Sequence, residues 1–176
     1  MKKLLWGLFF ILLNLTITAG DCKIGLLPSF IGYILLVIGF GGLSDRCENY
    51  RKIIPITKVA VAYSIIVYIL DLLPMGVSDD FLIILGIVGL ILQMYIPYEM
   101  IAGIKGLEKK YDLEFYGDQL SICWKMSVFC YVALYIALCL FWALAIVVSL
   151  VGWVVSFFFL SAMNGCKNTY CNLRTI

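Results

Sequence analysis

The chain has 176 residues, of which 64% are hydrophobic and 14% are charged, and its formal net charge is only +2. A soluble domain usually carries about 25% charged and roughly 45–50% apolar residues, and a chain this short has too little interior to hide so much apolar surface from water. Composition therefore excludes a soluble globular domain. The absence of basic runs also argues against a nucleic-acid partner.

Histidine is absent from the sequence, which removes the commonest general base and the commonest metal ligand. A Ser-His-Asp or Cys-His catalytic arrangement is therefore impossible within these 176 residues, and so is an H-E-x-x-H zinc site. Seven cysteines are present, but no two have the C-x-x-C spacing typical of thiolate zinc sites. We predict no enzymatic activity, no catalytic residues, no metal and no cofactor.

Apolar stretches predict the architecture, because a helix needs about 20 mostly apolar residues to cross the hydrocarbon core. The last stretch runs over residues 122–162 and would make one helix of about 61 Å, twice the core thickness. We therefore expect two spans here, with a turn near Phe141 to Ser149. The predicted fold is all-α, a polytopic transmembrane helix bundle over residues 1–163 with six spans, at residues 4–19, 26–43, 56–75, 81–101, 122–142 and 146–163.

The first predicted span also has features of a secretory signal peptide. It has a basic start and an apolar middle, and Thr18-Ala19-Gly20 precedes Asp21, which loosely fits the small-residue cleavage rule. Cleavage would leave five spans and the same inner and outer faces. We favour a retained first span, and hence six.

Two polar segments lie at one side of these spans. Residues 102–121 mix charged side chains with Leu107, Leu113 and Phe115, a spacing that predicts a short interfacial helix on the membrane surface. A solvated loop is an equally good interpretation. The tail over residues 164–176 is polar and is expected to be frayed. We place both segments in the cytoplasm.

The distribution of Lys and Arg predicts the orientation, because cytoplasmic loops carry an excess of both. With the N-terminus inside, six spans put every basic residue except Lys23 on the inner side, whereas the outer segment after the third span carries Asp79 and Asp80. We therefore predict a multi-pass protein of the cell (cytoplasmic) membrane, surrounded by the lipid bilayer, with both termini cytoplasmic. The basic residues on the inner side are Lys2, Lys3, Arg46, Arg51, Lys52, Lys58, Lys105, Lys109, Lys110, Lys125, Lys167 and Arg174.

Asp71 is the most costly residue in the predicted spans, since a carboxylate at the bilayer centre costs about 2.5–3.5 kcal/mol and less near the interface. Ser64, Tyr68 and Asp71 share one helical face, because positions i, i+4 and i+7 align. One interpretation is an ion or proton site that opens outward, which Asn14 and Asp21 near the first span would extend into a polar vestibule. The other, which we favour, is a carboxylate that reaches water or caps a neighbouring helix.

Lys58 and Glu99 lie at similar depth, near the inner ends of the third and fourth spans. We predict a helix–helix ion pair that locks two antiparallel helices, with a gate as the alternative. Pro97 stands two residues before Glu99. Because proline removes one backbone hydrogen bond, we expect it to kink or end the fourth helix.

Small residues recur within several predicted spans, and we interpret them as packing positions, because small side chains let membrane helices approach closely. No ligand is needed to account for them. They are Gly32, Gly39, Gly41 and Gly42 in the second span, Gly86 and Gly89 in the fourth, and the pairs Ala133 with Ala137 and Gly152 with Ser156.

The stretch Leu27-Pro28-Ser29-Phe30-Ile31-Gly32-Tyr33, after a Met1-Lys2-Lys3-Leu4-Leu5-Trp6 opening, resembles a family of small multi-pass membrane proteins from Gram-positive, clostridia-like bacteria. Tyr68-Ile69-Leu70-Asp71-Leu72 and residues 164–170 are similar too, so the resemblance covers nearly the whole chain. In that family Asp commonly follows the proline, whereas Ser29 stands here, so a carboxylate role does not carry over. The family has no assigned activity, and the resemblance implies a location without a mechanism.

Two functions of different class are consistent with these features. The first, which we favour, is a non-catalytic accessory or assembly role through helix contacts with another membrane protein or a second copy of the chain. It predicts a dry bundle whose polar residues are satisfied locally. The alternative is a small transporter or channel that uses Asp71 as an intramembrane ion or proton site. It predicts a water-filled cavity that Asp71 lines.

Overall fold

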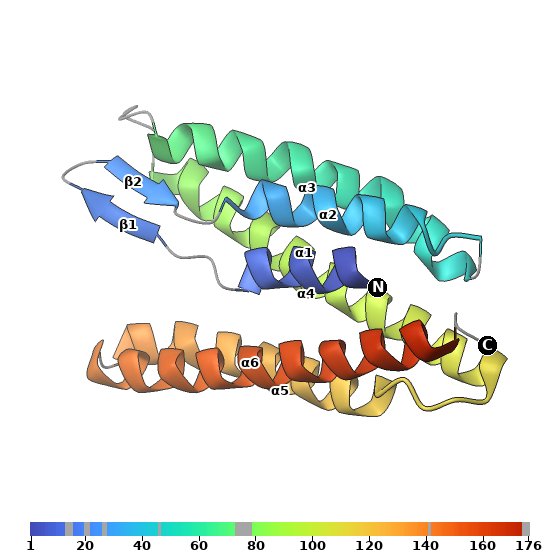
Figure 1. Ribbon diagram of the computed structural model, residues 1–176. Coiled ribbons are helices and arrows are strands. Elements are labelled where there is room, and N and C mark those ends of the chain that lie inside the picture. Colours follow the sequence, from blue (N-terminus) through green and yellow to red (C-terminus); the bar gives the residue numbers. More distant parts are fainter. Residues whose placement is uncertain are drawn as a thin grey trace. The chain divides into compact units, whose positions relative to one another are not determined.

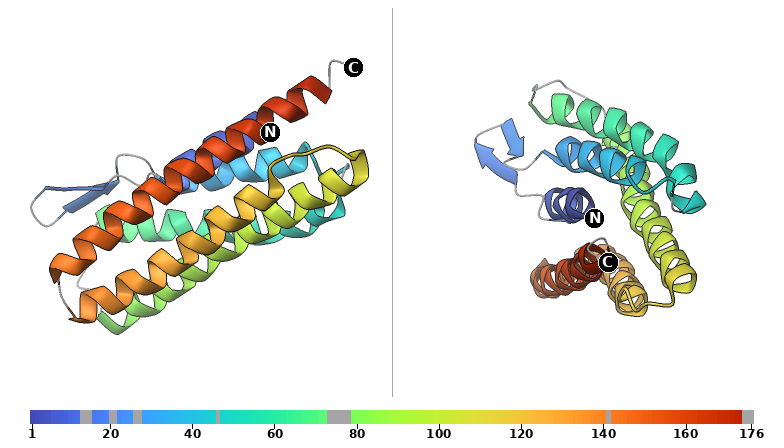
Figure 2. Two further views of the ribbon diagram at one scale, coloured as in Figure 1. Left: turned by 90° about the horizontal axis from the view of Figure 1, so that it is seen from below. Right: turned by 45° about the vertical axis from the view of Figure 1, so that its right-hand side comes forward.

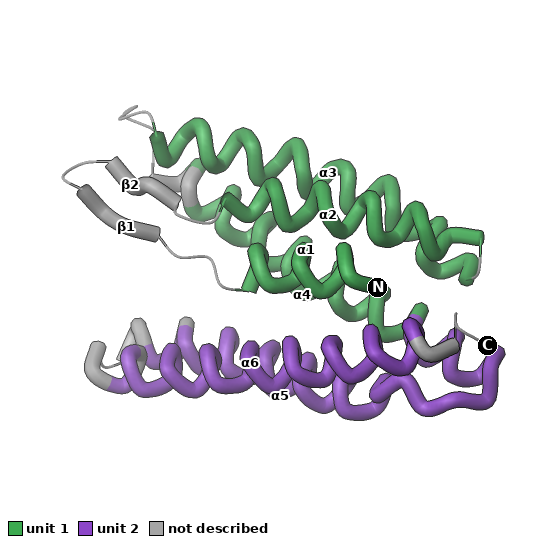
Figure 3. Tube along the Cα trace, in the orientation of Figure 1, with its two compact units in different colours: residues 1–103 green, residues 104–176 purple. Residues whose placement is uncertain are grey.

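The computed structural model describes residues 1–12, 16–19, 22–25, 28–45, 47–72, 79–140 and 142–173. Within these residues the chain forms six helices and one two-stranded hairpin (Figure 1). It divides into two compact units, residues 1–103 and residues 104–176 (Figure 3). The helical class predicted from composition is confirmed for the described residues, with the hairpin as the exception.

The chain begins with helix α1 (Lys2–Leu12), which is followed by strands β1 (Thr16–Ala19) and β2 (Cys22–Gly25). The strands pair antiparallel, with Thr16 opposite Gly25 and Ala19 opposite Cys22. The expectation of one helix over residues 4–19 is therefore wrong. The β-branched side chains of residues 16–18 lose rotamer freedom in a helix and favour extended backbone.

Helix α2 (Ser29–Gly41) begins directly after Pro28. Pro28 has an extended backbone, with φ −62° and ψ 122°, so it stands just outside the helix, where its missing N–H breaks no helical hydrogen bond. The helix thus begins three residues later than the predicted span over residues 26–43, and Leu26 and Leu27 lie outside the described residues.

Helices α1 and α2 touch through glycines. The buried residues of α1 are Leu4, Gly7, Leu8 and Ile11, which the helical repeat places on one face. A Cβ atom on Gly7 would lie 2.8 Å from the backbone oxygen of Gly32, and one on Gly32 would lie 2.7 Å from that of Gly7. The prediction that Gly32 serves close helix packing is confirmed.

Helix α3 (Glu48–Leu72) lies beside α2 (Figure 1), where the rings of Phe40 and Tyr50 stack with their centres 5.6 Å apart. It is joined to helix α4 (Asp79–Tyr111) by a hydrogen bond of 2.7 Å that the Tyr63 hydroxyl donates to the Leu85 carbonyl. The same hydroxyl faces Gly89, where an added Cβ would clash with it. The small residue at position 89 therefore makes room for a tyrosine of the neighbouring helix.

Helix α4 continues through Pro97 as far as Tyr111, so the expectation that this proline could end the helix is wrong. Proline is tolerated in helices of this kind when neighbouring groups satisfy the freed carbonyl. Residues 102–111, predicted as part of a separate surface segment, extend α4 instead. The connection to the next helix is short and includes two residues with positive φ, Asp112 at 51° and Tyr116 at 60°.

Helices α5 (Gly117–Leu140) and α6 (Trp142–Leu173) form an antiparallel helical hairpin (Figure 2). The helices are separated at residue 141, the first position of the predicted turn, and Phe141 itself lies outside the described residues. The expectation of a frayed tail is wrong for residues 164–173, which belong to α6. Met163 and Cys166 are buried, and such packing holds the end of a helix that its own sequence would leave marginal.

Three helices within the described residues are long and apolar enough to cross a membrane: α3, Ile83–Tyr111 of α4 and Ile146–Cys171 of α6. Helix α5 has 24 residues, or about 36 Å, and pairs with α6. Helices α1 and α2 have 11 and 13 residues, or about 17 and 20 Å, and are shorter than a hydrocarbon core of about 30 Å.

Candidate functional site

The predicted polar face of α3 consists of three side chains in different surroundings. Ser64 is buried and its hydroxyl lies 2.8 Å from the carbonyl of Ala60. Tyr68 is half-buried and its ring meets that of Phe30 edge-on, with the centres 5.5 Å apart. Asp71 is exposed at the next-to-last residue of the helix. The structure therefore places these residues along one helix without joining them in a polar cluster.

Four serine and threonine hydroxyls in the helices bond to the backbone of their own helix. Thr57 Oγ1 donates to the carbonyl of Ile53 at 2.9 Å, and the Ser127 and Ser156 hydroxyls each donate at 3.0 Å to the carbonyl four residues earlier. Ser64 follows the same pattern. Such bonds to the preceding turn use the hydroxyl hydrogen, which is then not offered to a solute.

The other predicted polar residues are not brought together either. Asn14 and Asp21 lie outside the described residues. Lys58 is exposed on α3, while Glu99 is half-buried on α4 and accepts a hydrogen bond from the side chain of Tyr95. Among the described residues, the ion pairs join Lys52 to Glu48 and Lys105 to Asp118, so the expected pair between Lys58 and Glu99 is not formed.

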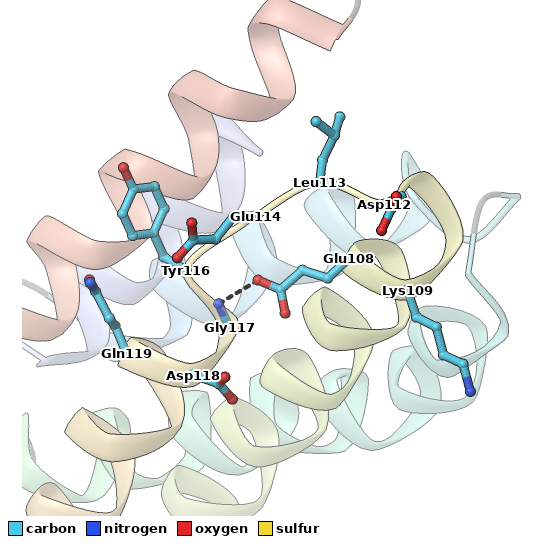
Figure 4. Close-up of a pocket in the computed structure, with 9 residues that line it drawn as sticks. All are labelled: Glu108, Lys109, Asp112, Leu113, Glu114, Tyr116, Gly117, Asp118 and Gln119. Carbon is cyan, nitrogen blue, oxygen red and sulfur yellow. Dashed lines mark hydrogen bonds between the residues drawn. The ribbon is translucent and has the colours of Figure 1, made fainter.

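Glu108 organises the connection between α4 and α5 in a way that the sequence did not reveal. Its Oε1 atom accepts hydrogen bonds from the backbone N–H groups of Phe115 and Gly117, each at 2.8 Å. Figure 4 shows the bond from Gly117. Phe115 is completely buried. One carboxylate thus satisfies two backbone donors at the start of α5, which is the task of a helix cap. A Glu seven and nine residues before the two donors has no standard capping spacing, so no sequence signal points to it.

An ion pair fixes the same connection from the other side. Lys105 Nζ lies 2.7 Å from Asp118 Oδ1, and Asp118 is in the first turn of α5, where a negative charge also favours the helix dipole. The hydrogen bond from Lys105, together with its positive charge, lowers the pKa of the Asp118 carboxyl. The group therefore stays ionised to lower pH than a free aspartate.

A cavity of about 490 Å³ lies over this connection, lined by residues from the end of α4 to the start of α5 (Figure 4). Its acidic side chains are separate rather than convergent, and no group of three or more potential metal ligands occurs among the described residues. Asp118 is paired with Lys105, and Glu108 is engaged by the backbone. The arrangement stabilises the connection.

Comparisons with protein-family models, with curated proteins and with solved structures find no match for this chain. The resemblance to a Gram-positive membrane protein family therefore stays a prediction.

Proposed function

We propose that the chain is an integral protein of the cell membrane with six crossings and both termini in the cytoplasm. The packing of unit 1 supports alternating crossings, because Leu4 at the start of α1 meets Gly39 at the end of α2. At the same end, Cys47 donates a hydrogen bond to the carbonyl of Gly103. Leu4, Gly39, Cys47 and Gly103 all lie near those ends of the predicted spans that carry most of the basic residues.

The short helices α1 and α2 still fit two crossings in this proposal. The β1–β2 hairpin between them has unpaired outer edges, which hydrocarbon does not tolerate. We place it at the outer headgroup region, and the bilayer thins locally around the two short helices, as it does at apolar segments shorter than its hydrocarbon core. Strand β2 also contacts α3.

We further propose a non-catalytic accessory or assembly role, exercised through helix contacts. The observation that carries it is the local bonding of four helical hydroxyls, which are buried at Thr57 and Ser64 and half-buried at Ser127 and Ser156: each bonds to its own helix. A solute pathway needs polar groups directed into a shared cavity, and these groups are directed into backbone.

Helix α4 offers an apolar surface for such contacts. Ile83, Ile87 and Ile91 are each more than half exposed and follow one another at a spacing of four residues, so they form a single ridge. Next to them, a Cβ on Gly86 would meet nothing within 4 Å. A glycine beside an apolar ridge lets a second helix approach closely.

Site-specific photo-crosslinking in native membranes tests this role. A photoreactive amino acid at Ile87 is expected to capture a discrete membrane protein or a second copy of the chain, and Gly86→Leu is expected to abolish that product. The same amino acid at Phe129, which is 74% exposed on α5, is the matched control for lipid-facing surface. Lipid adducts alone at both positions would contradict the proposed role.

The alternative function is ion or proton movement through Asp71, and one observation favours it. The carboxylate is exposed near the end of α3, where an ion from the outer side can reach it. Asp71→Asn keeps the shape and removes the charge. In liposomes loaded with a pH-sensitive dye, the accessory role predicts equal proton flux for wild type and variant, whereas a loss of about tenfold or more in the variant establishes the transport role.

A further inference from the structure

A groove runs along the hairpin of α5 and α6. It has a volume of about 750 Å³ and is formed by the C-terminal unit alone. Its walls change character along its length. One part is apolar, with Ile122 and Met126 from α5 facing Val151, Val154 and Phe158 from α6.

The other end of the groove is polar. Gln119, Asn164 and Asn168 contribute carboxamides, and Tyr116 contributes a phenol. These residues come from the beginning of α5 and the end of α6. The antiparallel hairpin brings the two together, as shown by the ring of Tyr116, which lies 3.0 Å from where a Cβ on Gly165 would be.

A positive charge is held at this polar end. Lys167 Nζ donates a hydrogen bond of 2.6 Å to Asn164 Oδ1, so a residue of the groove wall positions the ammonium group. Because the Asn164 oxygen is used in this bond, its amide N–H₂ group is left to donate. The nearby Asp118 is neutralised by Lys105. The polar end therefore offers several donors, and the Lys167 ammonium group lies beside it.

We propose that this groove binds one anionic membrane phospholipid, with an acyl chain along the apolar part and the phosphate at Lys167, Asn164 and Asn168. The α6 wall of the apolar part belongs to Ile146–Cys171, a stretch apolar enough to lie in lipid, so acyl chains are the apolar molecules that surround it. A phosphate needs donors and positive charge, which is what the polar end presents. The order of apolar wall and polar end matches the order of tail and headgroup in one lipid molecule.

The apolar part is tested with a phosphatidylglycerol that carries a diazirine in its acyl chain, added to the full-length protein in phosphatidylcholine vesicles. Labelling is expected within residues 151–158, and Val154→Trp, which fills the groove, is expected to reduce it about tenfold or more, since each displaced methylene is worth about fourfold in affinity. Val147→Trp is the matched control, because Val147 is exposed on the same helix two turns from Val154 and does not line the groove.

The polar end is tested by the choice of lipid. Wild-type protein purified from vesicles with equal amounts of phosphatidylglycerol and phosphatidylcholine is expected to retain the anionic lipid, as measured by native mass spectrometry. Lys167→Gln should lower that preference about fivefold, the effect of one basic residue near the surface. Lys109→Gln, which removes the same charge outside the groove, should leave the preference unchanged.

Three results would overturn the proposal. Equal labelling of wild type and Val154→Trp would show that the groove holds no acyl chain. Equal retention of the two lipids by wild type would remove the headgroup selectivity. A crosslink from position 154 to a second copy of the chain, or to residues 1–103, would show that protein covers the groove. In each case alkaline carbonate extraction tests membrane insertion separately, so failure of the lipid site is distinguished from failure of the membrane assignment.

Discussion

At the scale of single residues, several polar side chains in this protein bond to groups that are close to them along the chain. Glu108 binds the N–H groups of Phe115 and Gly117, and Lys105 pairs with Asp118 across the same connection. The sequence groups Ser64 with Asp71 in a candidate ion site, but the Ser64 hydroxyl donates its hydrogen bond to the backbone of α3 itself. These contacts fix where helices end and begin.

Glu108→Ala is expected to destabilise the protein by about 1.5–3 kcal/mol, since hydrogen bonds to a charged group are lost and two backbone donors are left without their acceptor. Unfolding by denaturant in detergent micelles measures this. Glu114→Ala is the control, because Glu114 is exposed in the same connection and makes no such bond. Its effect should stay within about 0.5 kcal/mol. Equal effects of the two substitutions would show that the capping bonds contribute nothing.

The ion pair between Lys105 and Asp118 predicts a pH dependence with a defined sign. The pKa of the Asp118 carboxyl is lowered in the folded protein, so the pair stabilises the connection above the ordinary aspartate pKa, and that contribution is lost as the pH falls through the lowered value. In Lys105→Gln, the pKa of Asp118 should return toward the ordinary aspartate value of about 3.9. An NMR titration of the Asp118 carboxyl carbon measures both values, and an unchanged pKa in the variant would refute the pairing.

At the scale of elements, packing between neighbours decides where a helix stops and how close two helices come. The apolar pattern anticipates helices near residues 56–75, 81–101 and 146–163, yet α4 and α6 run on to Tyr111 and Leu173. Hydropathy marks only the part of a helix that suits lipid. The polar turns beyond that part are helical because buried contacts such as those of Leu107 and Cys166 hold them.

The crossing of α1 and α2 predicts a sharp response to small substitutions. Gly7→Ala and Gly32→Ala each place a methyl group within 2.8 Å of the opposite backbone, and overpacking of this kind costs about 1–3 kcal/mol. Thermal unfolding in detergent micelles measures the loss. Gly86→Ala is the matched control, since its methyl group meets nothing within 4 Å and alanine is the better helix former. A loss of stability at Gly86 equal to that at Gly32 would show that backbone contact is not the reason.

At the scale of the whole molecule, the proposed topology places both termini on one side of the membrane. Tags at the two ends should both be protected from protease in intact cells and both become accessible in inverted vesicles. The chain should stay with the membrane fraction after alkaline carbonate extraction. Tags on opposite faces with residues 1–20 still attached would contradict six crossings, and recovery in the carbonate supernatant would contradict membrane insertion altogether.

From the sequence alone come the prediction that lipid surrounds this protein and the approximate positions of its long helices. Hydropathy and charge add up along the chain, so they can be read without knowing any contact. By the same route the absence of histidine excluded the common catalytic arrangements. The family resemblance and the function stay predictions, because neither follows from hydropathy or charge summed along the chain.

Only the tertiary structure decided which polar groups are paired and which surfaces are hollow. The capping role of Glu108, the meeting of Gly7 with Gly32 and the groove between α5 and α6 each join atoms from different elements. Their energies depend on distances of a few ångströms between residues that the chain order separates. A pattern along one segment carries no information about those distances, and packing alone sets them.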